Sequence, residues 1–153
     1  MSLRIIPFEP RLARHFKDLN VAWLKHYFFV EAKDEILLEN CENSIIGIGG
    51  YIFFAELKHS IAGCFSLIPI KEKQFELGKM AVDPEFQGLK IGQRLLEFAI
   101  EFAKEKQWEK IILYTSTKLP TALHVYRKYG FNEIELEKDV PYKRSDVKME
   151  LVL

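Results

Sequence analysis

Hydrophobic residues recur along this chain with two periods, one typical of helices and one typical of strands. From Arg11 to Tyr27 the apolar positions are spaced by four, three and four residues, which places them on one face of a helix (Leu12, Phe16, Leu19 and Trp23). The segment 91–108 likewise keeps its apolar residues on one face and its charged residues on the other. We therefore expect amphipathic helices over 11–27 and 91–108.

Two shorter helices are indicated by the residues at their ends. Asp34 stands before an apolar run, so it is expected to be the N-cap of a short helix. Pro120 suits a first helical turn, and Gly130 suits the position after a last turn. A further helix is therefore expected between these two residues.

The remaining apolar segments are typical of strands, because they are rich in β-branched and aromatic residues or alternate apolar with polar residues. The expected strands are 3–8, 44–57, 61–70, 75–82, 110–115, 131–136 and 146–153. The strand–helix–strand unit over 75–115 predicts a parallel pair with a right-handed crossover. The expected fold class is α/β or α+β, with a mixed sheet and helices on both of its faces.

The composition indicates one compact domain over residues 1–153, because this length is close to the usual domain size and 48% of the residues are hydrophobic. The 22 basic and 22 acidic residues cancel, so no global field attracts nucleic acid or an anionic membrane. The sequence shows neither a signal peptide nor an apolar run that could span a bilayer, and it has no metal-binding Cys/His pattern. We expect a cytoplasmic protein without a nucleic-acid partner, a membrane partner or a metal, and homodimer formation stays open.

The segment VDPEFQGLKIGQRLL, from Val82 to Leu96, carries the most informative chemistry. A strand ends at a proline, a short loop contains Gly88, and the long helix begins beside Gly92. The first amides of a helix have no intrahelical partner and, together with the helix dipole, form an anion site. The phosphate-binding patterns of P-loop proteins and of dinucleotide-binding folds are absent. The glycine spacing by itself is equally compatible with a plain loop and close helix packing.

Four segments resemble the GNAT superfamily of N-acetyltransferases. Q-G-L-K-I-G at 87–92 is similar to the family's [RQ]-x-x-G-x-[GA] signature, with Lys90 where the family usually has glycine. The segment 122–131 is similar to the family's A-x-x-x-Y-x-x-x-G-F pattern, and 76–82 resembles the strand that runs beside the pantetheine. The closing segment 142–151 also resembles the end of GNAT domains found with MarR-type regulators.

The resemblance implies a mixed, mostly antiparallel twisted sheet of about six to seven strands, with about four helices on both faces. It also implies acetyl-CoA as the acyl donor, with its pyrophosphate held by the amides of the loop after the strand. The residues expected to bind it are Met80, Ala81, Val82, Gln87, Gly88, Leu89, Lys90, Ile91, Gly92, Gln93 and Arg94. Lys90 departs from the pattern, because a non-glycine residue disfavours a positive φ. Leu119 stands where the family often has an asparagine.

Two catalytic residues are implied by the same resemblance. Tyr126 matches the tyrosine that protonates the coenzyme A thiolate, and an aromatic side chain packed in the core is the alternative. Glu76 stands where some members carry the general base, and a salt-bridged strand glutamate is the alternative. Regular alternation would put Glu76, Gly78, Met80 and Val82 on one face, with Gly78 leaving room beside the carboxylate.

The acceptor pocket is expected to form from the first helix pair, the hairpin strands and the final loop. Its candidate residues, which core packing could also explain, are Phe28, Phe29, Glu31, Tyr142 and Arg144. An aromatic wall with a carboxylate suits an amine, and Arg144 suits a substrate carboxylate.

The functional hypothesis is an N-acetyltransferase that moves an acetyl group from acetyl-CoA to a primary amine. The acceptor is expected to be a small molecule or amino-acid-like compound that attacks directly in a ternary complex. A non-catalytic acyl-CoA-binding or sensing module is the alternative, and a structural domain with an empty groove is a third hypothesis.

Overall fold

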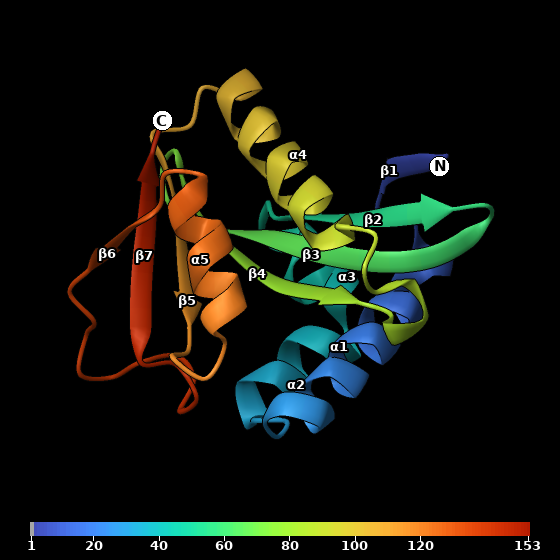
Figure 1. The fold of residues 1–153 in the computed structure, drawn as a ribbon, viewed down its shortest axis with the longest axis horizontal. Coiled ribbons are helices and arrows are strands. Elements are labelled where there is room, and N and C mark those ends of the chain that lie inside the picture. Colours follow the sequence, from blue (N-terminus) through green and yellow to red (C-terminus); the bar gives the residue numbers. More distant parts are fainter. Residues whose placement is uncertain (1) are drawn as a thin grey trace.

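The computed structural model describes residues 2–153 and contains a seven-stranded mixed sheet (Figure 1). The strands are β1 (Leu3–Pro7), β2 (Tyr51–Leu57), β3 (Ser60–Lys71), β4 (Gln74–Val82), β5 (Lys110–Thr115), β6 (Asn132–Ile134) and β7 (Val147–Val152). Their order is β1-β2-β3-β4-β5-β7-β6. β4 and β5 are parallel, and the other neighbouring pairs of the described strands are antiparallel. The expected mixed, mostly antiparallel sheet is confirmed.

Helices cover both faces of this sheet. They are α1 (Ala13–Tyr27), α2 (Ala32–Glu39), α3 (Cys41–Ser44), α4 (Ile91–Glu105) and α5 (Pro120–Lys128). The first three lie on one face, and α4 and α5 lie on the other (Figure 1). Within residues 2–153, no helix combines the length and the apolar character needed to cross a bilayer.

Alternation along β2 assigns its residues to two hydrophobic cores. Ile52 and Phe54 pack with residues of α1, α2 and α3, whereas Phe53 and Ala55 pack with α4. Both faces of the central strands are therefore covered, and the long apolar runs in this part of the sequence follow from that.

Two local expectations are wrong. Residues 44–50 are not part of a strand, because α3 ends at Ser44, a 3-10 turn follows over Ile46–Ile48, and Gly49 adopts a left-handed φ of 94°. Asp34 is not an N-cap either. Glu31 caps α2, and Asp34 is the third helical residue, whose carboxylate accepts the backbone N–H of Glu31 at 2.9 Å.

β4 and β5 pair over three residues only, Gln74–Glu76 with Lys110–Ile112. Both strands continue beyond this point, to Val82 and Thr115, but they are no longer paired with each other. The backbone of β4 from Leu77 onward therefore has no strand partner on the β5 side, and a gap opens between the two strands.

A bulge in β4 lies beside this gap. Ser66 pairs with Gly78 and Cys64 pairs with Ala81, so Lys79 and Met80 together oppose Phe65. The extra residue reverses the alternation, and Met80 and Val82 consequently pack against the α4-side core. The expectation that both share a face with Glu76 and Gly78 is therefore wrong.

Gly50 supports a test of the packing where β2 begins. A Cβ at this position would lie 2.7 Å from the carbonyl oxygen of Ile45 and 2.8 Å from that of Leu67. We expect Gly50→Ala to lower the free energy of unfolding by about 2 kcal/mol in urea denaturation, because backbone must shift to make room. Gly47→Ala is the matched control, since its Cβ would lie 3.4 Å from the nearest atom, the carbonyl oxygen of Glu42. Equal effects of the two substitutions would contradict this account.

Candidate active site between β4 and β5

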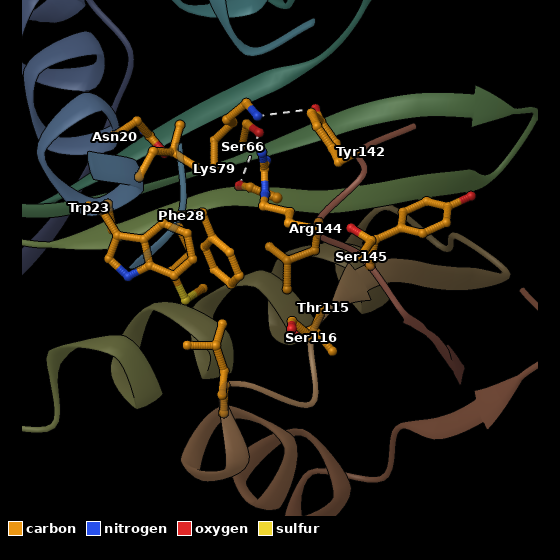
Figure 2. A pocket seen from close by; sticks show the side chains of 18 of the residues that line it. Asn20, Trp23, Phe28, Ser66, Lys79, Thr115, Ser116, Tyr142, Arg144 and Ser145 are labelled. Atoms are coloured by element: carbon orange, nitrogen blue, oxygen red, sulfur yellow. Dashed lines mark hydrogen bonds between the residues drawn. The ribbon is translucent and has the colours of Figure 1, made fainter. Parts of the chain in front are cut away.

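A cavity of about 260 Å³ occupies the gap between β4 and β5. Its walls come from α1, β4, the end of β5, α5 and the segment that precedes β7. Figure 2 shows Trp23 and Phe28 next to each other on one side of it, with Tyr142 and Ser145 on the other. The hydroxyl-bearing residues Thr115 and Ser116 line it where β5 ends. The cavity therefore joins the unpaired part of β4 to aromatic and polar side chains from distant segments.

The loop between β4 and α4 reaches one end of this cavity, where Gln87 and Gly92 line it. α4 begins at Ile91, and its first backbone hydrogen bond runs from the N–H of Arg94 to the carbonyl oxygen of Lys90. The amides of residues 91–93 therefore have no intrahelical acceptor. A Cβ at Gly92 would touch only Val82, at 4.0 Å, so the space beside this backbone is open. The arrangement is suited to binding an anion.

Lys90 adopts the left-handed conformation, with a φ of 57° and a ψ of 31°. This is the backbone geometry that a glycine would take most readily, and it costs a non-glycine residue about 1–2 kcal/mol. Lys90 therefore takes the left-handed backbone conformation that favours glycine, the usual residue at this position of the resembled signature.

The other residues expected to bind the cofactor divide into two groups. Met80, Ala81 and Val82 line the cavity together with Gln87 and Gly92. The side chain of Ile91 is buried in the core, and Leu89, Lys90 and Arg94 are exposed. Gly88 and Gln93 do not line the cavity. These last six residues can contact a ligand in the cavity only through their backbone or from the rim of the cavity.

Glu76 lines the cavity at the last β4 residue that pairs with β5. Its carboxylate lies beside Gly78, where a Cβ would be 3.6 Å from Oε2. None of the ion pairs formed within residues 2–153 includes it. Burial raises the pKa of Glu76, and the charges of Lys33 and Lys79 offset part of this rise. A carboxylate in this environment is a stronger base than one in water.

Tyr126 lies on α5 and also lines the cavity, with its ring centroid 5.8 Å from that of Phe131. Burial raises the pKa of Tyr126 to about 12, so the phenol stays protonated at neutral pH. It can act as a proton donor toward a group in the cavity.

A buried ion cluster stands beside the bulge. The Lys79 ammonium donates to Asp34 Oδ1 at 2.5 Å and to the Tyr142 hydroxyl at 3.1 Å, and Figure 2 shows the second of these bonds. Arg144 donates to both oxygens of Asp34, at 2.8 and 2.9 Å. The side chain of Asp34 has no exposed surface, and that of Lys79 is 5% exposed. Burial raises the pKa of Asp34, but the hydrogen bonds from Arg144 and Lys79 outweigh it and lower the pKa to about 2.

The expected acceptor residues are only partly brought together. Phe28, Tyr142 and Arg144 line the cavity, whereas Glu31 and Phe29 do not. Phe29 is 57% exposed. Glu31 caps α2, accepts the backbone N–H of Lys143 at 2.9 Å and pairs with Arg144 at 3.3 Å. Arg144 therefore already has two carboxylate partners and is not free to bind a substrate carboxylate.

The sequence did not reveal the roles of two charged residues of the site, one within a strand and one within a helix. Lys79 interrupts a mostly apolar strand, and Asp34 lies within the first turn of α2. A lysine in such a strand is a signal for a buried partner. The partner itself is not readable, because Asp34 and Lys79 are 45 residues apart in the chain.

Comparison with known proteins finds that this chain is similar to acetyltransferases. A family model described as "Acetyltransferase (GNAT) domain" matches residues 49–133. The N-acetyltransferase family 8 member 2 of Rattus norvegicus is 23% identical over 133 residues, which is 80% of this chain and 59% of the rat protein. The alignments cover less than two thirds of the length of this and two other curated relatives.

Two solved structures illustrate the likeness in fold. A GNAT-family acetyltransferase of Staphylococcus aureus Mu50 superimposes with a TM-score of 0.87 at 27% identity, covering 99% of both chains. The spermidine N-acetyltransferase of Vibrio cholerae, solved with CoA and spermine, has a TM-score of 0.75 at 22% identity and covers 98% of this chain and 95% of its own.

The ion cluster yields a stability test. We expect Asp34→Asn to lower the free energy of unfolding by about 3 kcal/mol near neutral pH, because the buried charges of Lys79 and Arg144 lose their shared partner. The folded-state pKa of Asp34, about 2, lies below its ordinary value of 3.8. Its contribution is therefore complete above roughly pH 4 and is lost as the pH falls toward 2. Urea unfolding of both proteins across this range should show their difference shrinking, and a difference that stays constant would contradict the assignment.

Proposed function

The chain belongs to the GNAT acetyltransferase family, and from this premise we propose that it transfers the acetyl group of acetyl-CoA to the primary amine of a small molecule by direct attack in a ternary complex. One observation carries the proposal. A single cavity joins the free amides at the start of α4 to Glu76 and Tyr126 through the gap between β4 and β5.

The residues present fit the pyrophosphate, the pantetheine arm and the thioester of the donor. The amides of residues 91–93 and the open side of Gly92 would hold the pyrophosphate. Met80, Ala81 and Val82 would lie along the pantetheine arm, because this part of β4 has no pairing with β5. The donor supplies a thioester, whose carbonyl carbon takes the attack of the amine. Backbone N–H groups at the bulge would polarise that carbonyl.

Two side chains would move the protons. Glu76 would accept the proton that the amine loses as its nitrogen bonds to the acetyl carbon, and the raised pKa of Glu76 favours this. Tyr126 would donate its proton to the coenzyme A sulfur as the carbon–sulfur bond breaks. The two groups lie on different elements, β4 and α5, which line the same cavity.

The charges around the cavity favour an amine as the acceptor. Trp23, Phe28 and Tyr142 provide aromatic surface, and Glu76 is a carboxylate outside the ion pairs. Lys79 and Arg144 are cations, but Asp34 and Glu31 neutralise them. The spermidine N-acetyltransferase of similar fold is named for a polyamine and was solved with CoA and spermine, which is consistent with a cationic amine as the acceptor.

Gly92→Glu tests the donor site. We expect it to abolish detectable acetyl-CoA binding in isothermal titration calorimetry, because a carboxylate would occupy the space proposed for the pyrophosphate. Gly92→Ala is the matched control and should bind within about threefold of wild type, since its Cβ would touch only Val82 at 4.0 Å. Unchanged affinity in Gly92→Glu would refute the placement of the pyrophosphate.

A panel of amines assayed by release of free coenzyme A tests catalysis. With the best acceptor, Tyr126→Phe should lower kcat about 10²-fold or more while leaving the affinity for acetyl-CoA nearly unchanged. In wild type, kcat/KM should fall as the pH drops through the raised pKa of Glu76, because protonation removes the base. Glu76→Gln should lower kcat/KM and flatten this acid limb.

Two outcomes would redirect the proposal. If acetyl-CoA binds but no amine in the panel is acetylated, the non-catalytic binding module becomes the better account. If Tyr126→Phe keeps full turnover, then Tyr126 is not the proton donor and its ring only packs against Phe131.

A further inference from the structure

The bulge in β4 has an unusual residue at its centre. Six non-glycine residues within 2–153 have a positive φ, and Lys79, at 52°, is the one that lies inside a strand. The other five lie in exposed turns or at helix ends. Left-handed backbone disfavours residues with a Cβ, so within a strand this conformation needs a restraint from the surroundings.

The side chain of Lys79 supplies such a restraint. Its ammonium is fixed from two directions, by Asp34 Oδ1 at 2.5 Å and by the Tyr142 hydroxyl at 3.1 Å, and it lies 4.4 Å from the centre of the Tyr142 ring. Asp34 is itself fixed by both guanidinium nitrogens of Arg144 and by the backbone N–H of Glu31. The cluster thus ties the bulge to α2 and to the segment before β7.

The conformation of Lys79 decides what β4 presents to the cavity. Without the extra residue, Met80 and Ala81 would exchange faces, because strand side chains alternate. With it, Met80 packs toward α4 and Ala81 packs toward α1, and both line the cavity along the unpaired edge of β4.

We propose that Lys79 and Asp34 are positioning residues, whose buried ion pair holds the bulge so that the backbone of Met80 and Ala81 faces the thioester of the donor. This proposal rests on the proposed function for the identity of the ligand. Neither residue exchanges a proton with the substrate, and both act through the backbone.

A glycine at position 79 distinguishes the effect of the backbone conformation from the effect of the charge. Lys79→Met keeps the length of the side chain, removes the ammonium and still disfavours a positive φ. Lys79→Gly also removes the ammonium but adopts a φ of 52° without restraint. Arg144 continues to neutralise Asp34 in both variants.

The measurement is the ratio of the dissociation constants of coenzyme A and acetyl-CoA in isothermal titration calorimetry. This ratio reports the contact with the acetyl carbonyl independently of turnover. Lys79→Met should lower the ratio about tenfold from the wild-type value, and Lys79→Gly should restore it to within about threefold. With the best amine, kcat should follow the same order while KM for acetyl-CoA changes less.

Lys73 provides the matched control. It is also a left-handed lysine, with a φ of 61°, but it lies exposed in the turn before β4 and forms no ion pair within the described residues. Lys73→Met and Lys73→Gly should leave the ratio unchanged. A change in the Lys73 variants equal to that in the Lys79 variants would overturn the proposal, because any strained turn in the hairpin would then have the same effect.

Other outcomes also decide the question. If the ratio falls as far in Lys79→Gly as in Lys79→Met, the ammonium acts by a route other than the backbone conformation, and the proposal fails. If Lys79→Met behaves as wild type, the ion pair does not hold the bulge. If wild type binds no acetyl-CoA, the proposed function fails. The amide NMR shifts of residues 78–81, each taken relative to the random-coil values for its own sequence, then test the bulge alone in the three ligand-free proteins. Lys79→Gly is expected to match wild type and Lys79→Met is expected to differ.

Discussion

The separation of β4 from β5 is the constraint on which the rest of the site depends. The two strands share only three paired residues, and each then runs on without the other. Unpaired strand edges inside a protein are costly unless another group satisfies their backbone. The cavity between these strands is therefore a place where a ligand can supply the missing partners, and its walls bring together residues from segments far apart in the chain (Figure 2).

Charge is distributed unevenly around this cavity. At one end, Lys79 and Arg144 face Asp34 and Glu31, so two cations and two anions form a neutral, rigid cluster. Glu76 remains outside the ion pairs, in an environment where burial raises its pKa. At the other end, the first turn of α4 offers amides without acceptors. The cavity thus offers free amides for an anion at one end and a carboxylate that can accept a proton in its middle. Transfer of a group between two bound molecules requires these two functions at separate places.

Two lysines take the left-handed conformation at opposite ends of this arrangement, Lys79 in the bulge and Lys90 before α4. Lys90 is exposed and takes this conformation at a position where glycine is the usual residue in the resembled signature. Lys79 is held by its buried partners. The two lysines therefore share a backbone conformation but have different surroundings. Of the two, Lys79 is the one whose side chain contacts distant segments, namely α2 and the segment before β7.

The sequence by itself determined the order of the strands and of every helix but α3, the family, and the glycine-containing loop before α4, because these depend on local periodicity and on short motifs. The long helix, the central strands and the loop over 87–90 all lie where their patterns indicate. It did not determine that residues 44–50 leave the strand, that Glu31 rather than Asp34 caps α2, or that the alternation of β4 reverses at Lys79. Nor did it reveal that Arg144 is paired already and that Phe29 is exposed and does not line the cavity. Only the tertiary structure decided these points, because each depends on contacts between residues far apart in the chain, and a local pattern carries no information about which distant charge or backbone atom a side chain will meet.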